Sequence, residues 1–315
     1  MNRLKWIVLG TLGVIFNATG QEQIMGWVSV DSVADILVKG GVEASVNDFT
    51  ETVVVEFESA SEQAYCTGVL IATNAVLTAA HCGRRSLVPV RVTAATSLGQ
   101  ALNLGTGGYA KHPPTGIPQV QSAGVASFAV MDGSAVKQGR NLGGRDLMVI
   151  KMKNGFVSPA SPIAISSLSG LNDARYVRFV GFGDDGQANR GRKLFADVPI
   201  ASARCTPTPV PGAASCKAGS ELFAKDPQGE FDACPGDSGG PVYVRSQFGR
   251  YRLVGIASRA SGLSSQCGRG TIVTLLDSDR LSWVTSHAAV QLNAQPLKPE
   301  LPVAKPCVPP DCYLK

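Results

Sequence analysis

Short β-rich segments separated by turn-forming residues run through most of this 315-residue sequence. Clusters of Gly, Asn, Asp and Ser bound each segment, and no crossover helix is indicated between them. Because such a succession of short strands is typical of antiparallel barrels and sandwiches, the sequence predicts an all-β fold. The expected strands lie within residues 53–57, 69–78, 147–152, 176–182, 194–200, 241–244, 251–257 and 271–276.

Two stretches depart from the strand pattern. Near the C-terminal end a helix is expected, with Ser278 as N-cap and Asp279 in the first turn. Residues 105–144 are rich in Gly, Ser and Ala, and we expect a long irregular loop there. The apolar face of the helix is formed by Leu281, Val284, Ala288 and Leu292.

Composition excludes several classes of protein. Charged residues make up only 17% of the chain and Gly accounts for 35 residues, which disfavours disorder, coiled coils and a mainly helical fold. Lys and Arg number 29 against 24 Asp and Glu, and loss of a leader carrying Arg3 and Lys5 leaves 27 against 24. Because phosphate binding needs a dense basic surface, we expect no nucleic acid partner.

The two ends of the chain indicate export and a tail. Residues 1–20 combine a basic start, an apolar stretch and small residues before Gln21, which predicts a cleaved signal peptide. The apolar stretch is too short to span a bilayer, so we expect a secreted or periplasmic protein with no transmembrane segment.

The Pro-rich residues 293–315 predict an extended tail in which Cys307 and Cys312 close a small loop on each other, with a mixed disulfide to a partner as the alternative.

The cysteines favour disulfides over a metal site. There are eight of them, an even number, and an exported chain meets an oxidising compartment. Their spacing contains no zinc-site pattern and the chain has only three His residues, so we expect no metal and no cofactor. Eight cysteines allow 105 pairings, and composition does not choose among them.

The strongest chemical signal is the string Cys-Pro-Gly-Asp-Ser-Gly-Gly-Pro at residues 234–241. A serine hydroxyl becomes a useful nucleophile only with a base to take its proton and N–H donors to hold the oxyanion. Glycines let backbone amides approach a substrate without an intervening Cβ. Ser238 is therefore the candidate nucleophile, against the alternative of an ordinary Gly-rich turn.

A base and an orienting acid can be assigned to the same chemistry. His81 directly follows a strand and precedes Cys82, whereas His112 lies in a loop and His287 in the expected helix. Asp146 precedes an apolar strand that would carry it into the core, where an orienting acid belongs. The alternative aspartates lie in more polar, turn-like contexts and are Asp132, Asp173, Asp184 and Asp185.

Together these strings resemble the chymotrypsin/trypsin-like serine endopeptidase family. The resemblance covers residues 38–292 and keeps the family's order of His, Asp and Ser. It implies two six-stranded antiparallel β-barrels with the active site in the cleft between them, plus the C-terminal helix. The strings that carry it are Cys-Thr-Gly-Val-Leu-Ile at 66–71, Leu-Thr-Ala-Ala-His-Cys at 77–82, Asp-Leu-Met-Val-Ile-Lys at 146–151, Gly-Phe-Gly at 181–183 and Gly-Asp-Ser-Gly-Gly-Pro at 236–241.

The resemblance also implies roles for single residues. Ser238 would attack the scissile carbonyl, His81 would act as general base and then acid, and Asp146 would orient His81. The amides of Gly236 and Ser238 would form the oxyanion hole. Substrates would be proteins or peptides, and an activating protease and a protein inhibitor are the further partners considered. The implied disulfides are Cys66–Cys82, Cys205–Cys216 and Cys234–Cys267, which leave Cys307–Cys312 as an extra pair.

In the specificity pocket the resemblance is uneven. Asp232 occupies the position that selects Arg or Lys in trypsin-like members, and Ser258 fits the pocket wall. Arg259 replaces the family's usual aromatic, and Ala260 stands where a glycine is usual. We expect cleavage after Arg or Lys, with Ala260 narrowing the pocket mouth and Arg259 repelling basic substrates.

Activation departs from the family pattern as well. In the family, a new N-terminus folds inward and pairs with the acid before the serine, which is Asp237 here. Val38 begins the segment most similar to that terminus, but Leu37 precedes it where Arg or Lys is usual. We expect residues 21–37 to be a propeptide removed by another protease or by a cut at an unusual bond. The alternative is that the segment stays attached and Asp237 is held another way.

Two other functions are compatible with parts of the sequence. Gly-Asp-Ser-Gly-Gly also fits the nucleophile elbow of an α/β-hydrolase esterase, but that motif needs a helix after the serine and the order Ser, acid, His. Here a strand follows Ser238, which disfavours the esterase. A catalytically silent family member that binds a protein partner through the cleft is the alternative from another class.

Overall fold

The computed structural model describes residues 38–84, 86–95, 120–133, 136, 142–157, 160, 163, 168, 170–183, 192–206, 209–246, 249–262 and 267–288. The expected signal peptide 1–20, propeptide 21–37 and tail 293–315 lie outside these residues. Among the helices of this part of the chain, none is long and apolar enough to cross a membrane.

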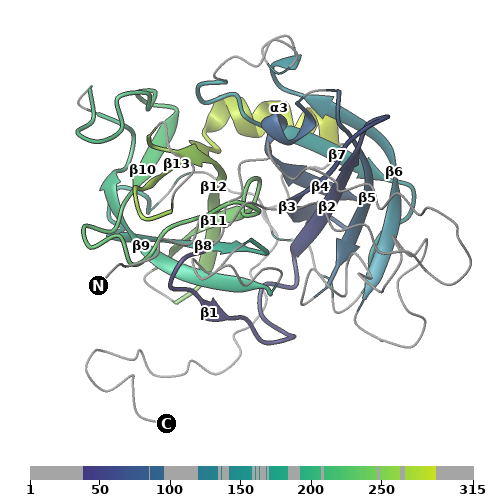
Figure 1. The fold of residues 1–315 in the computed structure, drawn as a ribbon, viewed down its shortest axis with the longest axis horizontal. Helices are drawn as coiled ribbons and strands as arrows, with labels where there is room; N and C mark the ends of the chain where they lie inside the picture. Colours follow the sequence, from purple (N-terminus) through teal and green to yellow (C-terminus); the bar gives the residue numbers. More distant parts are fainter. Residues whose placement is uncertain are drawn as a thin grey trace, which may run out of the picture. The chain divides into compact units, whose positions relative to one another are not determined.

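Six antiparallel strands close the first barrel, on the right of Figure 1. Their order around the barrel is β2-β3-β4-β7-β6-β5. Val55 of β2, for example, pairs with Cys66 of β3 on one side and Val92 of β5 on the other. The strands are β2 (Thr52–Glu58), β3 (Gln63–Ala72), β4 (Ala75–Thr78), β5 (Val88–Ala94), β6 (Gln121–Val130) and β7 (Met148–Met152).

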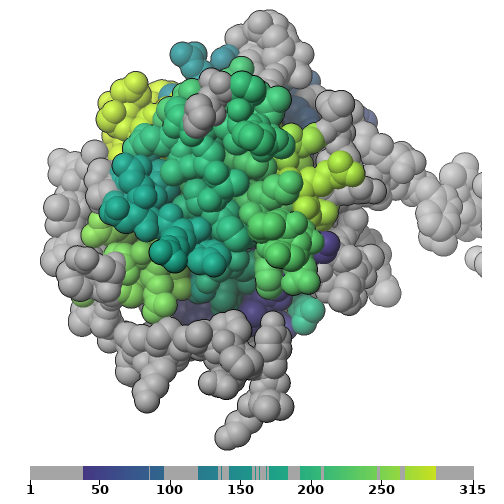
Figure 2. Space-filling model, turned by 90° about the vertical axis from the view of Figure 1, so that its left-hand side faces the viewer, coloured from purple at the N-terminus to yellow at the C-terminus, as the bar shows by residue number. Residues whose placement is uncertain are grey.

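A second ring of six antiparallel strands follows in the sequence, on the left of Figure 1. The order β9-β10-β13-β12-β11-β8 closes because β8 pairs with both β11 and β9. The short strand β1 (Val42–Glu43) adds to β9 at the edge. The six strands are β8 (Tyr176–Gly181), β9 (Leu194–Ser202), β10 (Glu221–Ala224), β11 (Pro241–Arg245), β12 (Tyr251–Ala260) and β13 (Thr271–Leu275). Figure 2 looks onto this side of the molecule, where teal and green segments cover much of the face.

The two-barrel architecture confirms the expected fold class, with local differences. The expected strand at 69–78 is divided between β3 and β4, because the chain turns at Thr73 and Asn74. The expectation of one irregular loop over 105–144 is wrong in its middle, where β6 pairs with β5 and β7. β6 is rich in Gly, Ala and Ser and owes its extended form to these neighbouring strands rather than to its own propensity.

The helix α3 (Ser278–Ala288) joins the two halves of the fold. It follows β13 of the second barrel but packs against β7 and β4 of the first. Leu281, Val284 and Ala288 are its buried residues, as the apolar spacing predicts, and Leu292 lies outside the described residues. Burial of a Leu or Val side chain contributes about 1.5–3 kcal/mol, so the helix is held mainly by this face.

Three disulfides are present in the described part of the chain. Cys66–Cys82 ties β3 to the short 3-10 helix η1 (Ala80–Gly83), with 6.4 Å between the Cα atoms. The other two, Cys205–Cys216 and Cys234–Cys267, lie in the second half of the chain. Cys307 and Cys312 are outside the described residues.

Candidate active site

His81, Asp146 and Ser238 lie in one hydrogen-bonded row. His81 Nδ1 is 2.7 Å from Asp146 Oδ2, and His81 Nε2 is 2.9 Å from Ser238 Oγ. His81 belongs to η1 after β4, and Asp146 lies shortly before β7, so both come from the first barrel. Ser238 precedes β11 of the second barrel. Residues up to 157 positions apart therefore meet where the two barrels join.

Asp146 is buried and accepts three hydrogen bonds. The His81 backbone N–H donates to Oδ1 at 2.8 Å, while Oδ2 accepts from the His81 ring and from the Ser258 hydroxyl at 2.6 Å. Burial alone would raise the pKa of Asp146, but the charge and hydrogen bonds of His81 and the Ser258 hydroxyl lower it overall. The side chain is thus an ionised acceptor that holds the imidazole in one orientation.

On either side of Ser238, two positions adopt backbone conformations that favour glycine. Gly236 has a φ of +104° and Gly239 one of +81°, a region that L side chains rarely adopt. At Gly239 a Cβ would stand 2.0 Å from Thr78 Oγ1, so any side chain there would displace the turn. Within the described part of the chain, the amides of Gly236 and Ser238 have no hydrogen-bond acceptor, which leaves two donors beside the serine hydroxyl.

The Asp232 side chain is buried, with only 2% of the residue's surface exposed. Its Oδ2 accepts from the amides of Gly268 and Gly270 at 2.8 and 2.9 Å, and its Oδ1 accepts from the Thr271 hydroxyl at 2.7 Å. Burial raises the pKa of Asp232, and these hydrogen bonds oppose the rise. The carboxylate is held by neutral donors only, since no cation pairs with it among the described residues.

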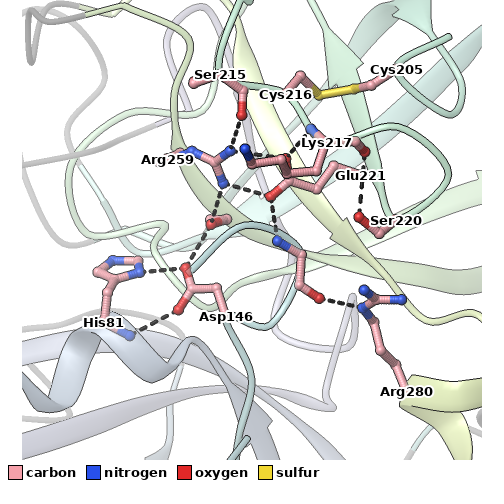
Figure 3. A network of polar contacts seen from close by, with 12 residues as sticks. His81, Asp146, Cys205, Ser215, Cys216, Lys217, Ser220, Glu221, Arg259 and Arg280 are labelled. Carbon is pink, nitrogen blue, oxygen red and sulfur yellow. Dashed lines mark hydrogen bonds and ion pairs between the residues drawn. A yellow bond between two sulfur atoms is a disulfide. The ribbon is translucent and has the colours of Figure 1, made fainter. Parts of the chain in front are cut away.

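The guanidinium of Arg259, the residue expected to repel basic substrates, is paired with a carboxylate in the structure. It forms a two-pronged ion pair with Glu221, at 2.6 and 2.8 Å, and also donates to the Ser215 carbonyl. Glu221 is fully buried. Figure 3 shows this pair beside His81 and Asp146. Because its positive charge is paired with a buried carboxylate, the Arg259 side chain has a structural role.

Glu221 also holds the segment that leads to Asp146. Its Oε1 accepts from the amide of Gly144, two residues before Asp146, and its Oε2 accepts from the amide of Lys217. The Arg280 side chain on α3 donates to the Gly144 carbonyl (Figure 3). Glu221 was not predicted as a functional residue, because nothing in the neighbouring sequence distinguishes it from a surface acid.

Val38 and Asp237, the two residues expected to pair on activation, are both buried. Val38 is fully buried in the core of the second barrel, and the amide of Lys39 donates to the Asp232 carbonyl at 2.8 Å. Asp237 accepts from the amides of Gly183 and Cys234 at 3.2 and 3.1 Å. The segment beginning at Val38 therefore packs against the turn that carries Asp232.

The remaining candidates lie elsewhere. His287 is on the exposed side of α3, where its Nδ1 lies 2.8 Å from the Trp283 carbonyl. Asp132 is 4.0 Å from Arg145, and Asp173 is an exposed turn residue. His112, Asp184 and Asp185 lie outside the described residues. In the part of the chain that is described, no group of three or more His, Cys, Asp or Glu side chains could hold a metal ion.

Comparison with known proteins gives consistent matches. A family model described as Trypsin matches residues 38–277. A trypsin-like protease of Streptomyces glaucescens is 31% identical over 242 residues, which cover 75% of this chain and 77% of that protein. The thrombin-like enzyme calobin-1 of Gloydius ussuriensis is 27% identical, covering 82% of this chain and 90% of that protein. Coagulation factor XII of Sus scrofa is 28% identical over 71% of this chain, but the match spans only 36% of that longer protein.

Proposed function

Because the chain belongs to the trypsin family of serine endopeptidases, we propose that Ser238, His81 and Asp146 are its catalytic triad and hydrolyse peptide bonds in protein substrates. The observation that carries this proposal is the row of two hydrogen bonds, 2.7 and 2.9 Å long, that joins carboxylate, imidazole and hydroxyl. This is the arrangement that a serine nucleophile needs.

The reaction proceeds through an acyl-enzyme. Ser238 Oγ attacks the scissile carbonyl carbon while its proton passes to His81 Nε2. His81 returns that proton to the leaving amine as the C–N bond breaks, and an ester on Ser238 remains. Water then attacks the ester, gives a proton to His81, and the proton returns to Ser238 as the acid product leaves. No cofactor takes part in these steps.

Asp146 and the backbone amides stabilise the charges that develop. The ionised Asp146 carboxylate stabilises the imidazolium that His81 becomes. The amides of Gly236 and Ser238 donate to the oxyanion, and their lack of an acceptor among the described residues supports this role. One such donor is typically worth about 2.7–4 kcal/mol of the barrier.

We propose cleavage after Arg or Lys, with Asp232 as the selecting carboxylate and Ser258 and Ala260 in the pocket wall. The buried charge of Asp232, balanced by neutral donors alone, supports this assignment because a substrate cation would complete it. The ion pair of Arg259 with Glu221 removes one objection, since a matched charge does not repel a basic substrate.

We propose that export and a cut before Val38 produce the active form. The three disulfides favour an oxidising, extracellular compartment. The complete burial of Val38 and the bond from the Lys39 amide to the Asp232 carbonyl support a mature chain that starts at Val38. We propose that its new amino group pairs with Asp237. N-terminal sequencing of active protein tests the cut, and a start far from Val38 would contradict it.

Labelling with a fluorophosphonate tests the triad directly. We expect the processed protein to be modified at Ser238, and His81→Ala to abolish the modification. Absence of reaction in correctly processed protein would favour a partner-binding role instead.

A mixed peptide library then tests specificity. Cuts after Arg or Lys that disappear in Asp232→Ser would support Asp232, whereas cuts after apolar residues would exclude it without affecting the triad.

A further inference from the structure

The buried side chain of Thr67 contacts the nucleophile turn from the opposite barrel. Thr67 lies in β3 of the first barrel and is fully buried. Its hydroxyl donates to the Gly236 carbonyl at 2.7 Å and accepts from the amide of Phe182 at 3.2 Å. Its own amide donates to the Ser238 carbonyl at 2.9 Å. One residue thus holds the carbonyls of both residues assigned to the oxyanion hole.

The Gly236 backbone needs such an external restraint. With no Cβ and a φ of +104°, its two flanking peptide planes can rotate about the Cα atom at little steric cost. Rotation would turn the Gly236 amide away from the oxyanion. Because the Thr67 hydroxyl anchors the carbonyl on one side of this Cα atom, it limits the rotation.

Thr67 is itself rigidly held. The Thr78 hydroxyl, at the end of β4, donates to the Thr67 carbonyl at 2.7 Å. All three polar groups of Thr67 are therefore engaged, and the disulfide from the preceding Cys66 to Cys82 ties the same strand to the segment that carries His81. Thr67 therefore links the segment that carries His81 to the turn that carries the amides of Gly236 and Ser238.

We propose that Thr67 is a positioning residue of the reaction, which sets the orientation of the Gly236 amide through the hydroxyl bond to its carbonyl. This inference rests on the proposed function, because the oxyanion exists only if Ser238 attacks a carbonyl. The Thr67 hydroxyl affects the reaction through the Gly236 amide, which donates to the oxyanion of the transition state, so loss of the hydroxyl lowers kcat and leaves KM nearly unchanged.

The test compares three variants of the full chain, processed alongside the wild type. Thr67→Val keeps the shape but removes the hydroxyl, and Thr67→Ser restores it. Thr93→Val is the matched control, since Thr93 is also a fully buried first-barrel threonine, bonded to Ser122 instead of the turn. Active sites are counted by fluorophosphonate titration, and kcat and KM are measured on a fluorogenic peptide amide.

We expect Thr67→Val to lower kcat at least about tenfold, short of the roughly 100- to 1,000-fold loss from deleting an oxyanion donor. KM should stay within about twofold, and affinity for a peptide aldehyde, which forms a tetrahedral oxyanion adduct, should fall in parallel with kcat. Thr67→Ser should recover most of both, and Thr93→Val should match the wild type.

Three results would overturn the proposal: full kcat in Thr67→Val, a loss in Thr67→Ser as large as in Thr67→Val, or an equal loss in Thr93→Val. Each assumes an active wild type. If the wild type neither cleaves peptides nor reacts with fluorophosphonate, the proposed function fails and this inference fails with it.

Discussion

The hydroxyl of Ser258, in β12 of the second barrel, donates a 2.6 Å hydrogen bond to the carboxylate of Asp146, which precedes β7 of the first barrel. Both side chains are buried. The bond adds a donor to Asp146 from the half of the molecule that supplies Ser238. The orientation of the acid thus depends on both barrels, although Asp146 and His81 both come from the first.

Ser258→Ala should therefore reduce turnover without removing a triad residue. A hydrogen bond to a charged group is worth about 1.5 kcal/mol or more, which corresponds to a roughly tenfold loss of kcat/KM. Kinetics on a peptide amide would measure it. Ser122→Ala, which removes a first-barrel hydroxyl bonded to Thr93, serves as the control and should keep full activity.

Lys193 should make stability rise with pH. Burial lowers the pKa of Lys193 from 10.5 to about 8, although the negative charges of Glu51 and Asp48 act to raise it. Between these two values the folded state binds fewer protons than the unfolded state, so the free energy of unfolding increases as the pH rises through this window. Denaturant unfolding of Ser238→Ala protein from about pH 7.5 to 9.5 should show the increase. Lys193→Met should remove it, and an unchanged slope in that variant would assign the effect to another group.

Glu221→Gln should strongly destabilise the fold. The variant leaves the Arg259 guanidinium half-buried and without its carboxylate partner, and breaking a buried pair costs about 3 kcal/mol or more. The exposed pair of Arg192 and Glu43 provides the comparison, since Glu43→Gln should cost less than about 1 kcal/mol. Urea unfolding of both variants, in the Ser238→Ala background, would measure the difference. Equal losses of unfolding free energy in the two variants would show that the buried pair stabilises the fold no more than the exposed one.

Gly181→Ala should inactivate the enzyme by displacing Asp237. A Cβ at Gly181 would stand 1.7 Å from Asp237 Oδ1, and Asp237 adjoins the nucleophile. Overpacking of this kind typically costs about 1–3 kcal/mol and shifts the backbone. Fluorophosphonate labelling should be lost, whereas Gly133→Ala, whose Cβ meets no atom within 4 Å, should label normally. Normal labelling of Gly181→Ala would show that the turn tolerates the shift.

Several strands with strong local signals were predicted from the sequence, whereas β5, β6 and β10 were not. β2, β8 and β11 lie within or close to the expected segments because β-branched and aromatic residues favour extended chain. β6 carries small residues, and β10 has only four residues, so neither gives a clear signal. Their partners β5, β7, β9 and β13 complete them.

By itself, the sequence determined the family, the order of His81, Asp146 and Ser238, and the glycines that the nucleophile turn requires. These follow from short strings, because backbone sterics and neighbouring residues act over a few positions. Only the tertiary structure decided that Arg259 pairs with Glu221, that neutral donors surround Asp232, and that Thr67 contacts Gly236. Those contacts join residues 36 to 169 positions apart, and they depend on how the strands pair and how the two barrels pack, which no local pattern encodes.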